Sequence, residues 1–426
     1  VLQGCRFLGD IETNVVAFDR ERLKRSSTLM AEQIDEAVSK LNSYPEVQQF
    51  IKDRGEFNPN STVQLRSLLF DYIGLEPTGK KTGTGADSTD AEVLGQLGEQ
   101  HEIPKLILEV RQNVKIKNTY LDKILPALDL DGRLRTGFNL HGTTSGRLSS
   151  SGKLNMQQIP HDNPIVKGCI KAKEGHQIVA MDLTTAEVYC AAVLAKDENL
   201  MDVFRQGGNF HSTIAKQVFK LPCEVEEVAE LYGDKRQQAK AVTFGIMYGA
   251  GPQKISWQVT KDSGKEFSVG EAQRVIAQYF EMFSNLKQWL THNQQFIRDN
   301  AFIYSFFGRK RRLPNAKSKD QGIASHEVRS RINFLVQSVA SDVNLLAAIE
   351  MNQWIKKVNM PARIFALVHD SILAEVPDEH VEEYCAKLQE CVQRERGVNI
   401  PNAPIGCDFE VGEDYSMGKF VAKYEV

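Results

Sequence analysis

Two aspartates in this sequence stand at the ends of apolar, strand-like runs, where a carboxylate is well placed for chemistry. Asp182 closes the run Gln-Ile-Val-Ala-Met-Asp, and Asp370, preceded by His369, closes the run Ile-Phe-Ala-Leu-Val-His-Asp. A sheet fixes the backbone at the end of a strand, while the side chain can face a cleft. Two such carboxylates, if the fold brings them together, indicate metal-assisted phosphoryl transfer.

A basic and aromatic segment between the two aspartates has a spacing that suits a nucleotide. Its members recur at every fourth residue, along one side of a predicted helix: Arg236, Lys240, Phe244 and Tyr248. The cations could hold a triphosphate and its leaving pyrophosphate, and a flat ring could lie against a sugar or base. An amphipathic helix with solvated cations and core aromatics has the same spacing, and spacing alone favours this alternative.

The composition is that of a globular protein with two or three subdomains. The chain has 426 residues, of which 42% are hydrophobic and 25% are charged. It has no run of about 18 apolar residues and no charged-then-apolar leader, so we expect no membrane partner. The net charge is −3, so any contact with nucleic acid must come from local basic patches. Seven cysteines without a CxxC pair indicate neither a disulfide framework nor a zinc site.

The first quarter of the chain is predicted to be helical. Residues 20–52 have helical spacing, and Ser61 can cap a second helix. Thr89 and Glu92 predict a capping box, and residues 104–124 predict another long helix. The first residue is Val, which indicates a processed chain or a piece of a longer polyprotein or multidomain chain.

Both aspartates fall where predicted strands and helices alternate. Residues 177–182 predict a strand followed by a helix over 185–195, and residues 363–376 predict two short strands about a turn. A helical block over 197–328, with a capping box at Ser268 and Glu271, lies between them. The pattern predicts an α+β protein in which helices are inserted between two halves of a sheet-bearing domain.

The ordered motifs resemble those of family A DNA polymerases, the class of bacterial DNA polymerase I. Residues 182–187 resemble motif A, residues 236–249 motif B and residues 368–370 motif C. Further matching segments follow the family's order: residues 145–150, 155–160, 210–213, 308–312 and 329–337. The resemblance implies a right-hand polymerase fold with an antiparallel-sheet palm, helical fingers and a helical thumb. It assigns 1–128 to the thumb, 129–196 and 329–426 to the palm, and 197–328 to the fingers.

The resemblance also implies which residues perform the chemistry. Asp182 and Asp370, with the backbone carbonyl of Leu183, would hold two Mg²⁺ ions that activate a primer hydroxyl and stabilise leaving pyrophosphate. The nucleotide-binding residues would be Arg236, Lys240, Phe244, Tyr248, His211 and Glu187. Phe244 rather than Tyr implies rejection of dideoxynucleotides, and Glu187, with Tyr248 beside it, would be a steric gate against a 2′-hydroxyl.

A second set is implied to contact primer–template DNA: Arg147, Asn155, Gln157, Arg329, Asn333, Gln337, His369 and Arg309. Arg329, Asn333 and Gln337 recur at every fourth residue on a predicted helical face. Such groups could sense correct pairing in the minor groove, where all base pairs present acceptors at similar positions. Without the resemblance, Asn333 and Gln337 would read as ordinary polar helix residues. For the basic residues 308–312, phosphate contact is favoured over a nuclear localisation signal or a solvated loop.

The sequence departs from the family at two motifs. Ser371 stands where the family usually has Glu, which removes one carboxylate from the metal neighbourhood. Motif A reads Asp-Leu-Thr-Thr-Ala-Glu rather than the common bacterial Asp-Tyr-Ser-Gln-Ile-Glu, which favours a bacteriophage-type branch. No segment resembles the family's proofreading exonuclease or flap nuclease, so we expect synthesis without proofreading.

The sequence therefore predicts a monomeric, template-directed DNA polymerase that adds deoxynucleotides to a primer 3′-hydroxyl, in replication or repair of viral or bacterial DNA. The expected location is the cytoplasm of a bacterium or phage-infected cell, with an organelle as the alternative. A single-subunit RNA polymerase is disfavoured because Glu187 fills the space that a ribose hydroxyl needs. A degenerate polymerase that only binds primer–template is suggested by Ser371, and is disfavoured by retention of Asp182, Asp370, Arg236 and Lys240.

Overall fold

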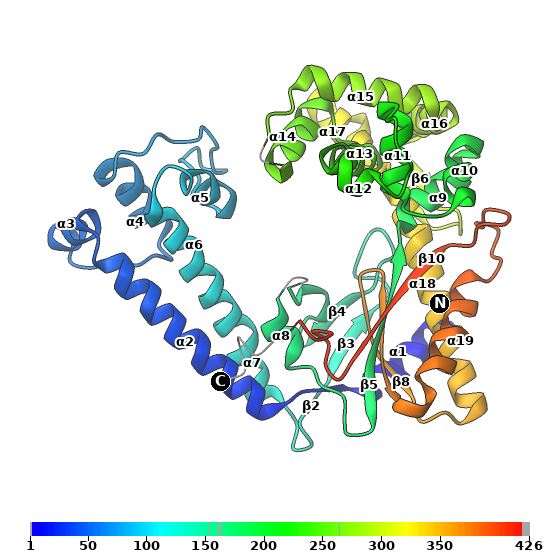
Figure 1. The fold of residues 1–426 in the computed structure, drawn as a ribbon, viewed down its shortest axis with the longest axis horizontal. Coiled ribbons are helices and arrows are strands. Elements are labelled where there is room, and N and C mark those ends of the chain that lie inside the picture. The colour runs from blue at the N-terminus through cyan, green and yellow to red at the C-terminus, as the bar shows by residue number, and fades with distance from the viewer. Residues whose placement is uncertain (1, 153, 161–162, 264, 420–426) are drawn as a thin grey trace. The chain divides into compact units, whose positions relative to one another are not determined.

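The computed structural model describes residues 2–152, 154–160, 163–263 and 265–419 (Figure 1). The chain divides into two compact units. The first comprises Val1–Asn14, Gly137–Ser150 and Gly175–Val411, and the second comprises Val15–Thr136, Ser151–Glu174 and Gly412–Val426. Helices and strands occur together, as the predicted α+β class requires.

A four-stranded sheet lies at the centre of the first unit. Its strand order is β10-β5-β9-β8, and the bounds are β5 (His176–Thr184), β8 (Arg363–Val368), β9 (Ser371–Pro377) and β10 (Gly406–Gly412). Both β5 and β8 pair with β9 in antiparallel fashion. Residues 364–368 and 372–376 are all buried, which explains why β8 reads as a continuous apolar run and why β9 is interrupted in that respect only by Glu375.

Helices from distant parts of the sequence pack against this sheet. They are α1 (Leu2–Asn14), α18 (Phe334–Val358) and α19 (Val381–Gln393), and α9 (Ala186–Ala195) packs on α18. The helical run Gln321–Val358 is long and apolar enough to cross a membrane, but 78% of its apolar window is buried within the protein. A helix that is apolar all round is expected in such a core position.

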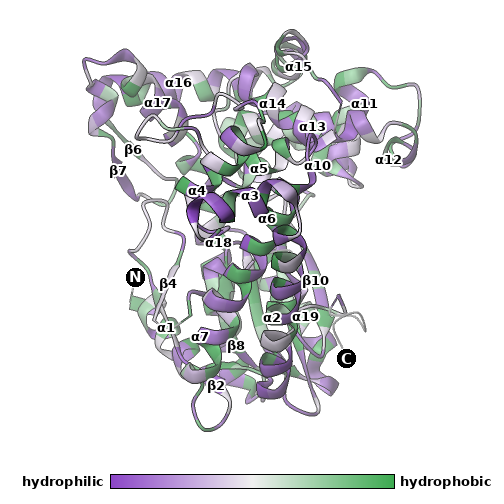
Figure 2. Ribbon diagram, turned by 90° about the vertical axis from the view of Figure 1, so that its left-hand side faces the viewer, coloured by the Kyte–Doolittle hydropathy of each residue, from purple (hydrophilic) through white to green (hydrophobic). Residues whose placement is uncertain are grey.

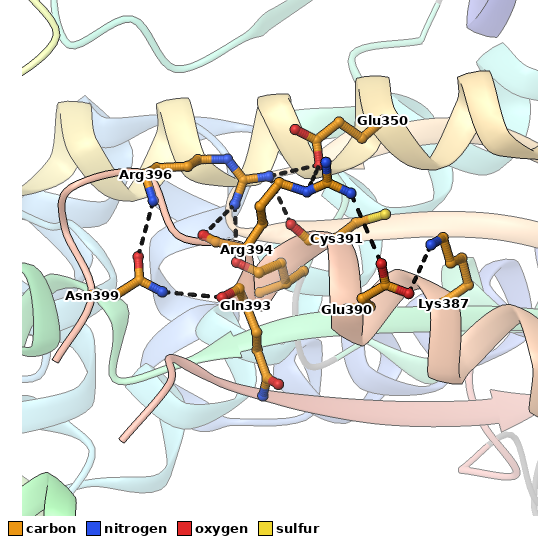
Figure 3. Close-up of polar contacts among 9 residues, drawn as sticks. Glu350, Lys387, Glu390, Cys391, Gln393, Arg394, Arg396 and Asn399 are labelled. Carbon is orange, nitrogen blue, oxygen red and sulfur yellow. Dashed lines mark hydrogen bonds and ion pairs between the residues drawn. The ribbon is translucent and has the colours of Figure 1, made fainter. Parts of the chain in front are cut away.

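The C-terminal end of α19 is fixed by an arginine (Figure 3). The Arg396 guanidinium donates to the carbonyl oxygens of Cys391 at 2.7 Å and Val392 at 3.3 Å, which the helix itself leaves without amide partners. The same guanidinium lies 2.9 Å from a Glu350 carboxylate oxygen on α18, and Arg394 lies 3.0 Å from that oxygen. These contacts tie α19 to α18.

The predicted helical insertion follows α9. Its helices are α10 (Glu198–Gln206), α11 (Phe210–Phe219), α12 (Val228–Leu231), α13 (Gly233–Met247), α14 (Pro252–Ser263), α15 (Val269–Met282), α16 (Ser284–Asn300) and α17 (Gln321–Arg331). A hairpin of β6 (Phe302–Tyr304) and β7 (Lys310–Arg312) precedes α17. The capping box predicted at Ser268 and Glu271 is confirmed at the start of α15.

The second unit is built mainly from helices. They are α2 (Arg20–Asn42), α3 (Pro45–Arg54), α4 (Thr62–Arg66), α5 (Ala91–Leu97), α6 (Glu102–Lys115), α7 (Asp122–Ile124) and α8 (Pro164–Gly168). Strand β1 (Val16–Ala17) pairs with β2 (Arg133–Leu134). Strand β3 (Thr136–Asn139) pairs with β4 (Ser149–Gly152), and the boundary between the units falls within both strands.

Several helix ends in the second unit test the local predictions. Ser61 caps α4 as predicted. The capping box predicted at Thr89 and Glu92 is wrong, because α5 is capped one residue later by Asp90 alone, whose carboxylate accepts the Val93 amide at 3.0 Å. The helix predicted over 20–52 is two helices, since the chain turns before Pro45, which occupies the first position of α3.

Two helical runs of the second unit widen into π-helical turns. Ser67–Tyr72 continues α4 and Ile116–Leu121 continues α6. A core of buried apolar side chains holds the helices together: Leu41, Val47, Phe50, Leu65, Leu68, Leu69, Val93, Leu94, Leu97, Ile103, Leu106 and Ile107. Burial of this cluster, rather than helix propensity, stabilises the short helices α4 and α5.

Candidate active site

The sheet brings the two predicted aspartates to the same edge. Asp182, near the end of β5, stands opposite Ser371 of β9, and Asp370 lies in the turn that joins β8 to β9. The Leu183 amide donates to the Asp370 carbonyl oxygen at 3.4 Å. Because this backbone contact joins the two segments, the spatial meeting that the chemistry requires is present.

The turns at this edge use strained backbone. His369 has φ +55° directly before Asp370, and Thr185 has φ +49° where the chain passes from β5 into α9. Residues other than glycine adopt this left-handed conformation at a cost of about 1–3 kcal/mol, and such strain gathers at functional sites. Here it directs Asp370 and the first turn of α9 toward one edge of the sheet.

A serine fixes the orientation of the first aspartate. The Ser371 hydroxyl donates to Oδ1 of Asp182 at 2.8 Å across the β5–β9 pair. The Asp182 side chain is otherwise exposed. Ser371 therefore does not supply a third carboxylate, but orients one that is already present.

Arg147 contacts the second aspartate and a neighbouring glutamate. Its Nη2 atom lies 3.2 Å from both carboxylate oxygens of Asp370 and 3.2 Å from Oε1 of Glu187. One guanidinium thus offsets negative charge from two segments that are far apart in the sequence.

Glu187, in the first turn of α9, is the most enclosed acid of this group. Its side chain is 6% exposed, and Oε2 has no hydrogen-bond partner within the described part of the chain. The Tyr248 hydroxyl donates to Oε1 at 3.2 Å, and Gln337 also interacts with the carboxylate. Burial raises the pKa of Glu187, although Tyr248 and Arg147 act in the opposite direction. Burial and the Glu187 carboxylate together raise the pKa of Tyr248 to about 12, so Tyr248 remains a donor.

The predicted basic and aromatic residues Arg236, Lys240, Phe244 and Tyr248 lie on α13 and at its C-terminal end. Arg236 donates through Nε to Asn209 at 3.3 Å, and the Lys240 side chain is exposed. Phe244 lies 5.6 Å, between ring centroids, from His211 on α11. A pocket of about 340 Å³ between α13 and α14 is lined by Lys240, Phe244 and Tyr248, among others. Lys240 and the two aromatic rings therefore line one open cavity, and Arg236 is not among its lining residues.

His211 is held neutral beside the cations of α13. Burial, followed by the positive charges of Lys240 and Arg236, lowers its pKa to about 4. The Nδ1 atom is buried and finds no partner among the residues that the structure describes. A neutral imidazole next to two cations can accept or donate a hydrogen bond without adding to the positive charge.

Glycine at position 249 permits a close approach behind Tyr248. Gly249 has φ +66°, and a Cβ atom built there would lie 2.3 Å from the Arg329 carbonyl oxygen. The glycine that ends motif B is therefore required both by its backbone conformation and by its contact with α17.

The predicted minor-groove set does not lie on one continuous helix. Arg329 is exposed on α17, Asn333 precedes α18, and Gln337 lies in its first turns. The α-helical hydrogen bonding is interrupted between α17 and α18, but Ile332 and Asn333 keep right-handed helical backbone angles. The shared face of the three residues stays a prediction. Asn333 is 6% exposed, and its Oδ1 atom has no partner in the described chain.

The remaining predicted DNA contacts lie in different places. Arg309 forms a two-pronged ion pair with Asp342, at 2.9 and 3.0 Å, and donates to the Ser145 carbonyl oxygen at 3.4 Å. Asn155 belongs to the second unit, where its side chain accepts the Gln157 amide at 3.0 Å. These contacts give the side chains of Arg309 and Asn155 structural roles, and the contact of Arg309, Asn155 and Gln157 with DNA stays a prediction.

The donor set at the sheet edge fits Mg²⁺. Asp182 and Asp370, whose segments meet here, would be its two carboxylate ligands. Among the described residues, no group of three or more His, Cys, Asp or Glu side chains gathers to hold a metal. Mg²⁺ commonly binds to one or two carboxylates and completes its shell with water and substrate phosphate. The guanidinium of Arg147 lies 3.2 Å from Asp370, so one positive charge already contacts the carboxylates of this edge.

The DNA polymerase family A profile matches residues 21–417 of the chain. The chain belongs to DNA polymerase family A. It is 46% identical to the DNA polymerase of Escherichia phage T5 over 98% of this chain and 52% of that protein. It is 32% identical to the thermostable DNA polymerase I of Thermus thermophilus over 97% of this chain and 47% of that protein. The chain thus spans about half the length of these relatives.

A solved structure shows the same fold. The POL domain of Pol1 from M. smegmatis, in complex with DNA primer-template and dNTP, matches with a TM-score of 0.85 and 27% identity. The match covers 98% of this chain and 70% of that chain. The predicted α+β fold with palm, fingers and thumb is therefore confirmed.

Sequence reasoning missed several residues that position the site. Asn209, which contacts Arg236, also caps α11 by accepting the Ser212 amide at 3.1 Å. The spacing of an Asn before a helical run could have found this cap. Asp342 holds Arg309, and no local pattern connects an acid on α18 with a hairpin arginine.

Proposed function

We propose that this chain catalyses template-directed addition of deoxynucleotides to a primer 3′-hydroxyl. The observation that supports this most strongly is the meeting of Asp182 and Asp370 at one sheet edge, through the Leu183 amide and the Asp370 carbonyl. Family membership and the DNA and dNTP named for the M. smegmatis structure support the same substrates.

Asp182 and Asp370, with the Leu183 carbonyl, would hold two Mg²⁺ ions. When bound, the ions would activate the primer hydroxyl and stabilise the charge of the leaving pyrophosphate. Ser371 keeps one Asp182 oxygen oriented. Arg147 holds Asp370 in place and must share or release that carboxylate when a metal binds.

The incoming nucleotide would lie between the sheet edge and α13. Arg236 and Lys240 would bind its phosphates, and His211 would add a hydrogen bond from a neutral ring. Phe244 would lie against the sugar and base, and in this family Phe there implies rejection of dideoxynucleotides. Glu187, enclosed and held by Tyr248, would leave no room for a 2′-hydroxyl.

The wider assignments rest on the family. We propose a thumb over residues 1–128, a palm over 129–196 and 329–426, and fingers over 197–328. Primer–template would contact Arg147, Asn155, Gln157, Arg309, Arg329, Asn333, Gln337 and His369. The phage T5 relative supports a role in replication or repair of viral or bacterial DNA, in a bacterial or phage-infected cytoplasm. Synthesis by a monomer is part of this proposal.

The test is extension of a labelled primer with Mg²⁺ and deoxynucleotides by the parent, Asp182→Asn and Asp370→Asn. We expect the parent to extend, and each variant to lose at least about a hundredfold in rate, because several kcal/mol of charge stabilisation is removed. Both variants should still bind primer–template. A parent that binds DNA without extending it would support the binding-only alternative that Ser371 suggests.

A further inference from the structure

The β6–β7 hairpin concentrates aromatic and basic side chains. Eight of the eleven residues 302–312 are of these types: Phe302, Tyr304, Phe306, Phe307, Arg309, Lys310, Arg311 and Arg312. The segment contains no Asp or Glu. In Figure 2, β7 carries the hydrophilic colour beside β6.

Strand register sorts these side chains onto two faces. Ile303, opposite Arg311, is 3% exposed and faces the protein. Side chains alternate along a strand, so the neighbouring positions point the other way. They form what we call the basic-aromatic face: Phe302, Tyr304, Lys310 and Arg312.

Cation and rings on this face are in direct contact. The Lys310 Nζ atom lies 4.0 Å from the Phe302 ring centroid and 5.5 Å from that of Tyr304. The two ring centroids are 5.5 Å apart. Tyr304 is nevertheless 50% exposed, and Lys310 and Arg312 are also exposed. The face therefore presents π surface and positive charge together.

Two further rings lie at the turn of the hairpin. Phe306 is 47% exposed and Phe307 is 39% exposed, with centroids 5.1 Å apart. Together with Tyr304 they leave apolar surface in water at one place, which is typical of a binding surface.

The hairpin is fixed close to the candidate active site. Arg309, which follows the turn, is paired with Asp342 of α18 and donates to the Ser145 carbonyl oxygen. Ser145 is two residues before Arg147, which contacts Asp370. The rings are thus held near the loop that reaches the catalytic aspartates.

We propose that the basic-aromatic face and the turn rings bind the unpaired 5′ part of a template strand. This inference rests on the proposed function, because a template strand that continues unpaired beyond the primer end is a substrate of that function. Single-stranded DNA is bound by a combination of cations for its backbone and aromatic rings for its bases, without regard to sequence. Duplex DNA covers its base faces, so the rings would add nothing to its binding. The absence of acids in residues 302–312 fits a polyanion.

The experiment measures fluorescence anisotropy with a blunt duplex and with the same duplex carrying a 5′ overhang of about ten nucleotides, without divalent metal. We expect the parent to bind the overhang DNA more tightly. Tyr304→Leu with Phe307→Leu, which keeps apolar bulk but removes the rings, should lower affinity for the overhang DNA about fivefold or more. Affinity for the blunt duplex should not change.

A matched control removes a ring elsewhere. Trp354→Leu takes away an aromatic ring whose centroid lies 6.0 Å from the Lys387 Nζ atom. It should leave the ratio of the affinities for overhang and blunt DNA unchanged. If the hairpin variant has a lowered melting temperature, Arg312→Gln provides the second measurement. It should weaken overhang binding and reduce the salt dependence of that binding by about one counterion.

Two results would overturn the proposal. In one, the hairpin variant loses affinity for blunt and overhang DNA by the same factor, which would mean that the hairpin contacts duplex DNA. In the other, neither affinity changes. Primer extension, measured separately, distinguishes the failure of one proposal from the failure of the other. A parent that binds the overhang DNA more tightly than the blunt duplex, but does not extend a primer, would contradict the polymerase activity and would still support single-strand binding by the hairpin.

Discussion

The end of the central sheet and helix α13 carry opposite charges and hold them differently. At the sheet, Ser371 bonds to Asp182 at 2.8 Å and Arg147 contacts Asp370 at 3.2 Å, so both acids are oriented by the protein itself. On α13, Lys240 is exposed and Arg236 makes one long hydrogen bond of 3.3 Å to Asn209. The acids are preorganised, whereas the cations remain adaptable. Under the proposed function, this difference would suit a site that binds small metal ions and a larger, departing phosphate group together.

Substitution of Arg236 and Lys240 tests whether α13 binds the nucleotide. We expect Arg236→Gln with Lys240→Gln to weaken deoxynucleotide binding by about a hundredfold or more, since each charge-assisted hydrogen bond contributes about 1.5–3 kcal/mol. Stopped-flow fluorescence with primer–template measures the nucleotide Kd. Lys235→Gln, on the same helix but with its Nζ atom over the Phe219 ring, is the control and should bind normally. Unchanged affinity in the double variant would remove α13 from the nucleotide site.

Glu187 connects the two regions, because it contacts Arg147 of the sheet side and Tyr248 at the end of α13. Glu187→Gly should reduce discrimination against ribonucleotides by about a hundredfold, the scale on which a pocket rejects an added hydroxyl. Competing incorporation of ribo- and deoxynucleotides measures this ratio. Glu187→Gln keeps the volume and should retain most of the discrimination. If Gly and Gln behave alike, the steric assignment is wrong.

The pKa of His211 depends first on its burial and then on the cations of α13. Its folded-state pKa of about 4 is below the ordinary 6.5, so the unfolded chain binds the proton more readily between these values. The stability contribution is therefore complete above about pH 6.5 and is lost as pH falls toward 4, by at most about 3 kcal/mol. Urea unfolding across this range should show the loss in the parent and a smaller one in His211→Asn. By NMR, Lys240→Gln should raise the His211 pKa, and a pKa that does not move would contradict the electrostatic cause.

The smallest expected effect concerns the sheet side. Ser371→Ala should raise the Mg²⁺ concentration for half-maximal extension by about twofold to tenfold, because one hydrogen bond of about 0.5–1.5 kcal/mol no longer orients Asp182. Ser371→Thr retains the hydroxyl on a strand-compatible residue and should resemble the parent. Binding of Mn²⁺, followed by electron paramagnetic resonance, gives a readout that does not depend on turnover. Equal behaviour of the Ala and Thr variants would show that Ser371 does not position Asp182.

Features encoded locally could be predicted from the sequence. Asp182 and Asp370 were found because continuous apolar runs end at them, and the helix that carries Lys240 was found from its four-residue spacing. The capping box at Ser268 was correct, whereas the one at Thr89 was not, since the helix begins one residue later and Asp90 caps it through the Val93 amide, while the Glu92 carboxylate pairs with Lys80.

Contacts between distant segments could not be predicted in this way. Arg147 and Asp370 are 223 residues apart, and periodicity carries no information on such a pair. Arg309 with Asp342 and Ser371 with Asp182 are of the same kind. The resemblance to a family indicated that these motifs share one site, but the ion pairs and hydrogen bonds that orient them depend on the folded sheet and on α18.

The π-helical turns of the second unit have a consequence for chain length. In each, amides reach back five residues instead of four, as Ile73 does to the Leu68 carbonyl and Asp122 to that of Lys117. Such a turn contains one residue more than the α-helix that could replace it, while the helix on either side keeps its buried face. Deletion of one exposed residue, such as Asp71 or Thr119, should therefore be absorbed locally, so these helices can gain or lose a residue without turning their apolar sides away from the core.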